Sequence, residues 1–153
     1  MKEIRTEIDI AAPVNEVWSI LTDFARHAQW NPFIREISGE LRKGAQLQVN
    51  LGAPGKRAMR FKPIVEMVEP QKTFRWLGHL FFPGLFDGEH IFELESTGEN
   101  TTRFIQREKF NGILVGIFSK SLDTDIKNGF MAMNEALKKE VEKTAGKVTP
   151  GSA

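Results

Sequence analysis

The chain has 153 residues, of which 41% are hydrophobic and 27% are charged, a balance that is typical of one globular domain and excludes general disorder. Its 21 basic and 20 acidic residues nearly cancel and the basic ones are scattered, which argues against nucleic acid as a main partner. The lack of cysteine excludes disulfides, a thiol nucleophile and thiolate metal ligands.

The first ten residues predict a half-buried strand over residues 2–10. Charged side chains alternate there with an inward row formed by Ile4, Thr6, Ile8 and Ile10. This start contains no apolar segment typical of a signal peptide, and no apolar run in the chain approaches the roughly 20 residues that cross a bilayer. We therefore expect a cytoplasmic protein without an integral membrane segment.

Two short helices are predicted next. Pro13 suits the first turn of a helix, and apolar residues follow it at helical spacing: Val14, Val17, Trp18 and Leu21. A second short helix is predicted over about residues 24–28. It ends before Pro32, which disfavours helical geometry at the residue that precedes it.

Residues 33–110 predict six strands that are joined by short connections and therefore form an antiparallel meander. The predicted ranges are 33–41, 46–51, 59–68, 73–80, 86–96 and 102–110. Pro63 falls inside the third range, so we expect a sheet edge or a bulge there, because proline cannot donate a ladder hydrogen bond.

The last part of the chain predicts a long amphipathic helix. Its apolar residues recur at helical spacing: Leu114, Phe118, Leu122, Ile126, Phe130, Met133, Leu137 and Val141. Gly112, Gly116 and Gly129 each weaken a helix by about 1 kcal/mol relative to alanine, so we expect a break or kink in its first half. Residues 1–144 are predicted to form a single domain, followed by a flexible polar tail over 145–153.

This order of elements, with the segments "AAPVNEVWSILTDF", "WNPFI", "FDGEHIFEL" and "EKFNGIL", resembles the helix-grip superfamily of START-related domains over about residues 2–143. The similarity is greatest to its bacterial branch of polyketide cyclase/dehydrase and lipid-transport proteins. The resemblance implies an α+β fold in which a curved seven-stranded antiparallel sheet wraps around the long C-terminal helix, with two short helices between the first and second strands. It also implies an internal cavity for an apolar or amphipathic molecule, often without a cofactor or metal.

Two ionisable side chains are predicted to point inward. One face of the strand near residue 90 carries Phe86, Gly88, His90, Phe92 and Leu94, and one face of the next strand carries Phe104, Gln106, Glu108 and Phe110. If residues 98–100 form a three-residue loop, the numbers of facing residues sum to 198. His90 then lies opposite Glu108.

Burial of this pair requires a reason, because an unpartnered buried polar group costs about 1–3 kcal/mol. His90 and Glu108 can form a structural pair, can be the polar end of a ligand site, or can act in catalysis, with the histidine as a general base. All three interpretations stay open, and we prefer ligand orientation.

The resemblance places Trp30 and Phe33 near the cavity mouth, although for Trp30 we slightly prefer a packing role. We expect the remaining lining to comprise Met59, Phe61, Trp76, His90, Phe92, Gln106, Glu108, Phe130 and Met133. We expect His79 to face solvent and His27 to lie at the entrance or on the surface. The spacing of the three histidines does not indicate a metal site.

We therefore predict a carrier or sensor that binds a small hydrophobic or amphipathic molecule in an internal cavity, without a cofactor, as a monomer or loose dimer. The alternative is a cofactor-independent cyclase, dehydratase or isomerase that uses His90 and Glu108. A third possibility is a protein-interaction module akin to the related domains that activate a chaperone ATPase.

Overall fold

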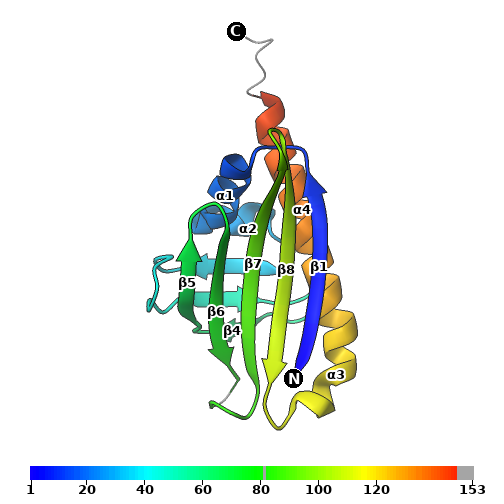
Figure 1. The fold of residues 1–153 in the computed structure, drawn as a ribbon. Helices are drawn as coiled ribbons and strands as arrows, with labels where there is room; N and C mark the ends of the chain where they lie inside the picture. Colours follow the sequence, from blue (N-terminus) through cyan, green and yellow to red (C-terminus); the bar gives the residue numbers. More distant parts are fainter. Residues whose placement is uncertain (81, 148–153) are drawn as a thin grey trace.

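The computed structural model describes residues 1–80 and 82–147, which adopt the predicted helix-grip fold (Figure 1). Five antiparallel strands form the larger sheet, in the order β1-β8-β7-β6-β5. Their bounds are β1 (Lys2–Ile10), β5 (Ile64–Glu69), β6 (Thr73–His79), β7 (Asp87–Gly98) and β8 (Thr101–Asn111). A second sheet crosses behind it and contains β2 (Ile34–Ser38), β3 (Gln48–Leu51) and β4 (Met59–Phe61).

The helices pack behind the larger sheet and include the two short helical segments predicted between the first and second strands. These are α1 (Val14–Thr22) and the pair formed by the 3₁₀ turn η1 (Phe24–Arg26) and α2 (His27–Trp30). The C-terminal helical region contains α3 (Val115–Ser121), the π-helical segment η2 (Leu122–Ile126) and α4 (Lys127–Lys147). None of the helices described is both long and apolar enough to span a membrane.

The described residues form eight strands in two sheets, where the sequence analysis expected seven in one. The predicted strand over 59–68 is divided between β4 and β5, because Pro63 has no N–H with which to continue a ladder. The chain changes sheet at this point. The carbonyl of Pro63 accepts a hydrogen bond from the Leu47 amide at 2.9 Å, and Gln46 forms a bridge with Ile64, so the two sheets stay joined at this corner.

The expected break in the long helix is the π-helical segment over 122–126, not a kink at a glycine. A π-helical turn inserts an extra residue and rotates the side chains that follow, a feature that often occurs at functional sites. Helix α4 then continues to Lys147, beyond the predicted domain end at residue 144. The remaining part of the predicted tail, 148–153, lies outside the described residues.

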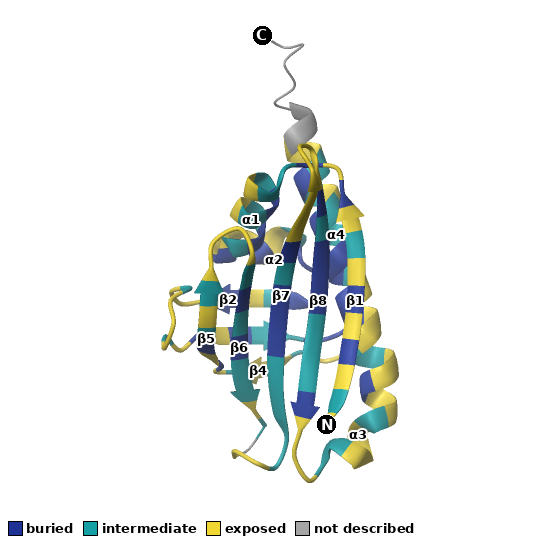
Figure 2. Cartoon of the chain, viewed as in Figure 1, coloured by how far each residue is buried: buried dark blue, intermediate teal, exposed yellow. Residues whose placement is uncertain are grey.

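The predicted pairing of β7 with β8 is confirmed. His90 lies opposite Glu108, and facing residue numbers sum to 198 from Asp87 to Ser96. A bulge between Ser96 and Gly98 shortens the loop to two residues without changing this register. Alternate side chains of β7 and β8 therefore point toward α4, and Figure 2 shows the central stretches of both strands buried.

Asn31 organises the "WNPF" segment between α2 and β2. Its Oδ1 accepts hydrogen bonds from the amides of Phe33 and Ile34, each at 3.0 Å, and its Nδ2 lies 3.1 Å from Nδ1 of His27. Nε2 of His27 lies 2.7 Å from the Leu21 carbonyl oxygen, to which it donates. The expectation that His27 lies at the entrance or on the surface is wrong: the ring is 1% exposed, and burial lowers its pKa.

Gly129→Ala is expected to destabilise the protein although alanine is the better helix former. A Cβ at residue 129 would overlap the ring of Phe33, which is 1% exposed and would have to shift from its contact with Phe130. Overpacking costs about 1–3 kcal/mol, which outweighs the gain of about 1 kcal/mol in helix propensity. Urea denaturation should therefore give a lower free energy of unfolding.

Gly116→Ala is the matched control, because a Cβ there would meet no atom within 4 Å. It should raise the free energy of unfolding by up to about 1 kcal/mol. Equal stabilisation by both substitutions would contradict the close packing of Phe33 on Gly129.

Candidate functional site

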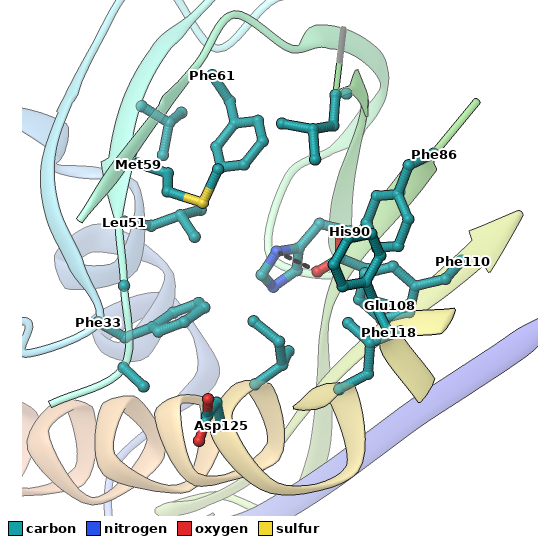
Figure 3. Close-up of a pocket in the computed structure, with 18 of the residues that line it drawn as sticks. Phe33, Leu51, Met59, Phe61, Phe86, His90, Glu108, Phe110, Phe118 and Asp125 are labelled. Atoms are coloured by element: carbon teal, nitrogen blue, oxygen red, sulfur yellow. Dashed lines mark ion pairs between the residues drawn. The ribbon is translucent and has the colours of Figure 1, made fainter. Parts of the chain in front are cut away.

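A cavity of about 520 Å³ lies between the larger sheet, the smaller sheet and the junction of α3 with α4 (Figure 3). This volume is in the range of small-molecule binding sites, which are mostly apolar with a few convergent polar groups. The apolar walls include Phe33, Leu51, Met59, Phe61, Trp76, Phe86, Phe110 and Phe118.

Two glycines on neighbouring strands leave room within the concave face. Gly78 of β6 lies opposite Gly88 of β7, and both border the cavity. A Cβ at Gly78 would meet only the Cβ of Pro63, at 3.7 Å, so the space reaches the backbone there. A Cβ at Gly88 would overlap the carboxyl group of Glu108. Gly78 therefore leaves volume for a ligand, and Gly88 leaves volume for Glu108.

His90 is held among aromatic rings at the wall of the cavity. Its imidazole stacks on Phe92 with ring centroids 4.2 Å apart, and the rings of Phe130 and Trp76 lie at 4.9 Å and 5.3 Å. The residue is 1% exposed. Burial lowers the pKa of His90 because the charged imidazolium would lose its hydration, so the ring is neutral at pH 7.

A chain of buried hydrogen bonds continues from His90 away from the cavity. Nε2 of His90 lies 2.9 Å from Oε1 of Gln106, Nε2 of Gln106 lies 2.9 Å from Oδ1 of Asn134, and Nδ2 of Asn134 lies 2.9 Å from Oγ1 of Thr6. All four residues are buried. The chain thus connects β7, β8, α4 and β1 through an otherwise apolar interior, where each unpaired polar group would be costly.

Glu108 lies beside the His90 end of this chain and borders the cavity. Its Oε1 lies 3.5 Å from Nδ1 of His90, and its side chain is 17% exposed. Burial raises the pKa of Glu108 to about 8, because the carboxylate would lose hydration. At neutral pH the carboxyl group therefore keeps its proton. The raised pKa of Glu108 and the lowered pKa of His90 make this an uncharged polar spot. Figure 3 shows the two side chains beside each other at the cavity.

The other polar groups of the cavity wall come from its surrounding segments: Lys56 and Arg57 before β4, His79, and Ser121 and Asp125 near the π-helical segment. His79 is exposed, as predicted. Its Nδ1 lies 2.7 Å from Oδ1 of Asp87, which also accepts a hydrogen bond from the Gly84 amide.

Within residues 1–80 and 82–147, no three histidine, aspartate or glutamate side chains are grouped so that they could hold a metal ion.

The structure brings together six of the residues that the sequence analysis proposed as ligand-binding. Phe33, Met59, Phe61, Trp76, His90 and Glu108 all border the cavity. The other five do not. Phe92 and Phe130 pack on the far side of His90, Gln106 bonds behind it, and Met133 is fully buried in the core. Trp30 packs against His27 instead, with ring centroids 4.7 Å apart, in agreement with its packing interpretation.

Thr6 and Asn134 also belong to the site, and neither was predicted from the sequence as part of it. Both carried a weak signal: Asn134 lies four residues after Phe130, on the apolar face of the helix, and Thr6 belongs to the inward row of β1. A polar residue in an apolar row needs a buried partner. The partners, however, can be identified only when β1, β8 and α4 are placed together in the fold.

Solved structures of similar fold include an aromatase/cyclase, ZhuI, from Streptomyces sp. R1128, with a TM-score of 0.77 at 14% identity over 94% of this chain and 95% of that one. The protein TTHA0849 from Thermus thermophilus has a TM-score of 0.72 at 19% identity, over 94% and 99%. Norcoclaurine synthase from Thalictrum flavum has 0.72 at 15%, over 94% and 96%. These likenesses define the class of protein by its fold alone.

The sequence itself identifies the family. Residues 1–147 match the family described as polyketide cyclase / dehydrase and lipid transport, and the chain belongs to that family. No curated protein sequence matches the chain.

Glu108→Gln is expected to remove part of the pH dependence of stability. Glutamate in the unfolded chain ionises near pH 4.5, whereas folded Glu108 stays protonated up to about pH 8. The free energy of unfolding should therefore fall as pH rises between these values, by at most about 1.4 kcal/mol per pH unit. Glutamine cannot ionise, so the variant should lack this part of the slope.

Urea denaturation of both proteins between pH 5 and pH 8 measures the effect as a difference. Glu66, whose pKa burial raises to about 7, is present in both proteins and cancels. Parallel stability curves would show that Glu108 is ionised in the folded protein and would contradict the uncharged pair.

Proposed function

We propose that the protein binds a small hydrophobic or amphipathic molecule in this cavity and acts as its carrier or sensor. The observation that carries the proposal is the apolar cavity of about 520 Å³ that reaches the backbone at Gly78. Membership in a family described by cyclisation, dehydration and lipid transport agrees with such a ligand.

The apolar walls supply the affinity in this proposal. A ligand that buries about 200 Å² of apolar surface gains about 5 kcal/mol, from which the cost of association must be subtracted. The pair of His90 and Glu108 lies at one wall and gives an otherwise uniform cavity one polar contact, which fixes the orientation of the ligand.

Exposed apolar side chains lie on the segments that border the cavity at the α3 end. Phe82, Ile113 and Ile117 are 59%, 79% and 74% exposed. Nearby, Phe118 of α3 meets Phe86 at 5.6 Å between ring centroids, and both border the cavity. An apolar molecule that enters at this end would meet apolar side chains before it reaches the interior, which supports uptake from or release to apolar surroundings.

Gly78→Leu is expected to abolish ligand binding while the fold stays intact. A Cβ at this position has ordinary contacts, so the leucine side chain can extend into the cavity and fill it. Native mass spectrometry of the protein purified from its own cells should detect a co-purifying small molecule. In a thermal-shift screen with an apolar compound library, a binding compound at 100 times its Kd should stabilise the wild type by about 2.7 kcal/mol.

Glu95→Leu is the control, since it adds the same side chain at an exposed position of β7. This variant should keep ligand binding, whereas Gly78→Leu should show no thermal shift. Two results would contradict the proposal: a wild type that neither carries nor binds any compound, or a Gly78→Leu variant that binds as the wild type does.

A cofactor-independent cyclase or dehydratase is the second candidate function. The proximity of a protonated carboxyl group and a neutral imidazole favours it, because together they can give and take a proton, as a dehydration requires. The family description names the same reaction classes.

His90→Gln separates the two candidates. For a carrier, the substitution should weaken binding of the co-purifying molecule several-fold without abolishing it. For an enzyme, binding should persist while chemical conversion of that molecule, followed by chromatography, is lost, and the wild type should show a bell-shaped pH profile. Glu95→Gln, at an exposed position of β7 outside the cavity, should change neither property.

A further inference from the structure

The buried hydrogen-bonded chain has a fixed direction that begins at Thr6. Oγ1 of Thr6 lies 3.3 Å from the backbone oxygen of Gln106, which can only accept, so the hydroxyl proton is used there. Thr6 must then accept from Asn134. This places Nδ2 of Asn134 toward Thr6 and Oδ1 toward the side chain of Gln106.

The direction continues through Gln106. Because Oδ1 of Asn134 accepts, the Gln106 side chain donates from Nε2, and the same nitrogen lies 3.5 Å from the Phe130 carbonyl oxygen, a second acceptor. The opposite orientation of the amide would set two oxygens against each other. Oε1 of Gln106 therefore faces His90, and His90 donates to it from Nε2.

The last step lies between His90 and Glu108. A neutral imidazole that carries its proton on Nε2 has a lone pair on Nδ1. Nδ1 lies 3.5 Å from Oε1 of Glu108, and this contact is favourable only if the carboxyl group donates. Burial favours the uncharged form of both groups, since it raises the pKa of Glu108 and lowers that of His90. The second carboxyl oxygen then has no proton and can only accept.

We propose that this polarised chain leaves Glu108 as a hydrogen-bond acceptor at the cavity wall, so that the ligand is an uncharged apolar molecule with a hydroxyl donor, an alcohol or a phenol. The inference rests on the proposed function and specifies its ligand. An ammonium ion would require an ionised carboxyl group. An anion would bring a further acceptor to a carboxyl group whose only proton already points toward Nδ1 of His90.

The tautomer of His90 tests the direction of the chain without any ligand. Nitrogen-15 NMR of protein labelled at its three histidines, assigned with His79→Gln and His27→Gln variants, distinguishes a protonated Nε2 from a protonated Nδ1. A protonated Nε2 with a bare Nδ1 is the expected result. A protonated Nδ1 would mean that every bond of the chain runs the other way, so that Glu108 presents a carboxylate to the cavity, and would overturn the proposal.

Three naphthalene probes test the ligand class by isothermal titration calorimetry. The wild type should bind 2-naphthol at least tenfold more tightly than its methyl ether, 2-methoxynaphthalene, and more tightly than the 2-naphthylmethylammonium cation. Glu108→Gln should keep this preference, because its amide can donate to His90 and present its oxygen to the hydroxyl group. Glu108→Leu should bind the naphthol and the ether equally.

The outcomes separate this inference from the proposed function. Equal binding of naphthol and ether by the wild type would overturn the hydroxyl assignment and leave a cavity that binds apolar molecules. Preference for the ammonium probe, or loss of the naphthol preference in Glu108→Gln, would identify an ionised Glu108 and overturn it as well. If none of the probes binds, the hydroxyl assignment fails, and the compound library and the Gly78→Leu variant decide separately whether the proposed function fails with it.

Discussion

The interior of this protein depends on a polar chain that must be fully paired, because it crosses an apolar core. Gln106 is 0% exposed and Asn134 is 3% exposed, so an unpaired amide at either position would destabilise the fold. Their mutual hydrogen bond fixes α4 against β8, and the Asn134 contact with Thr6 extends the connection to β1. The same chain ends at His90, beside Glu108, so the interaction that positions the long helix also positions the histidine at the polar spot of the cavity.

The cavity exists because the concave face of the larger sheet is filled unevenly. In one part, Phe74, Phe92 and Phe104 pack with α1 and α4 and leave no space. In the other part, Gly78 and Gly88 contribute no side chain, and Leu122 and Ile126 of the π-helical segment border the cavity at the edge of the core. Across the cavity, Phe33 reaches its place only because Gly129 lets its ring lie against α4. Glycines therefore define two walls of the site.

The sequence predicted the parts of this arrangement that depend on local periodicity. Two-residue alternation identified the inward rows of β7 and β8, and a short loop set the register that places His90 opposite Glu108. Alternation does not predict which inward residues reach the cavity. Phe92 and Phe110 have the same alternation, yet only Phe110 borders the cavity, because Phe92 is packed among other aromatic rings. The division at Pro63 and the partners of Asn31 and Asn134 also depend on contacts between distant segments.

The central claim is that a small apolar molecule occupies this cavity with its hydroxyl group at Glu108. A crystal structure with 6-bromo-2-naphthol tests it most directly, because anomalous scattering locates the bromine. The account predicts the ring system between Phe33, Phe61 and Phe86, with its oxygen at hydrogen-bonding distance from the Glu108 carboxyl group. A cavity closed by its own side chains, or a molecule bound with its oxygen turned away from Glu108, would contradict the account.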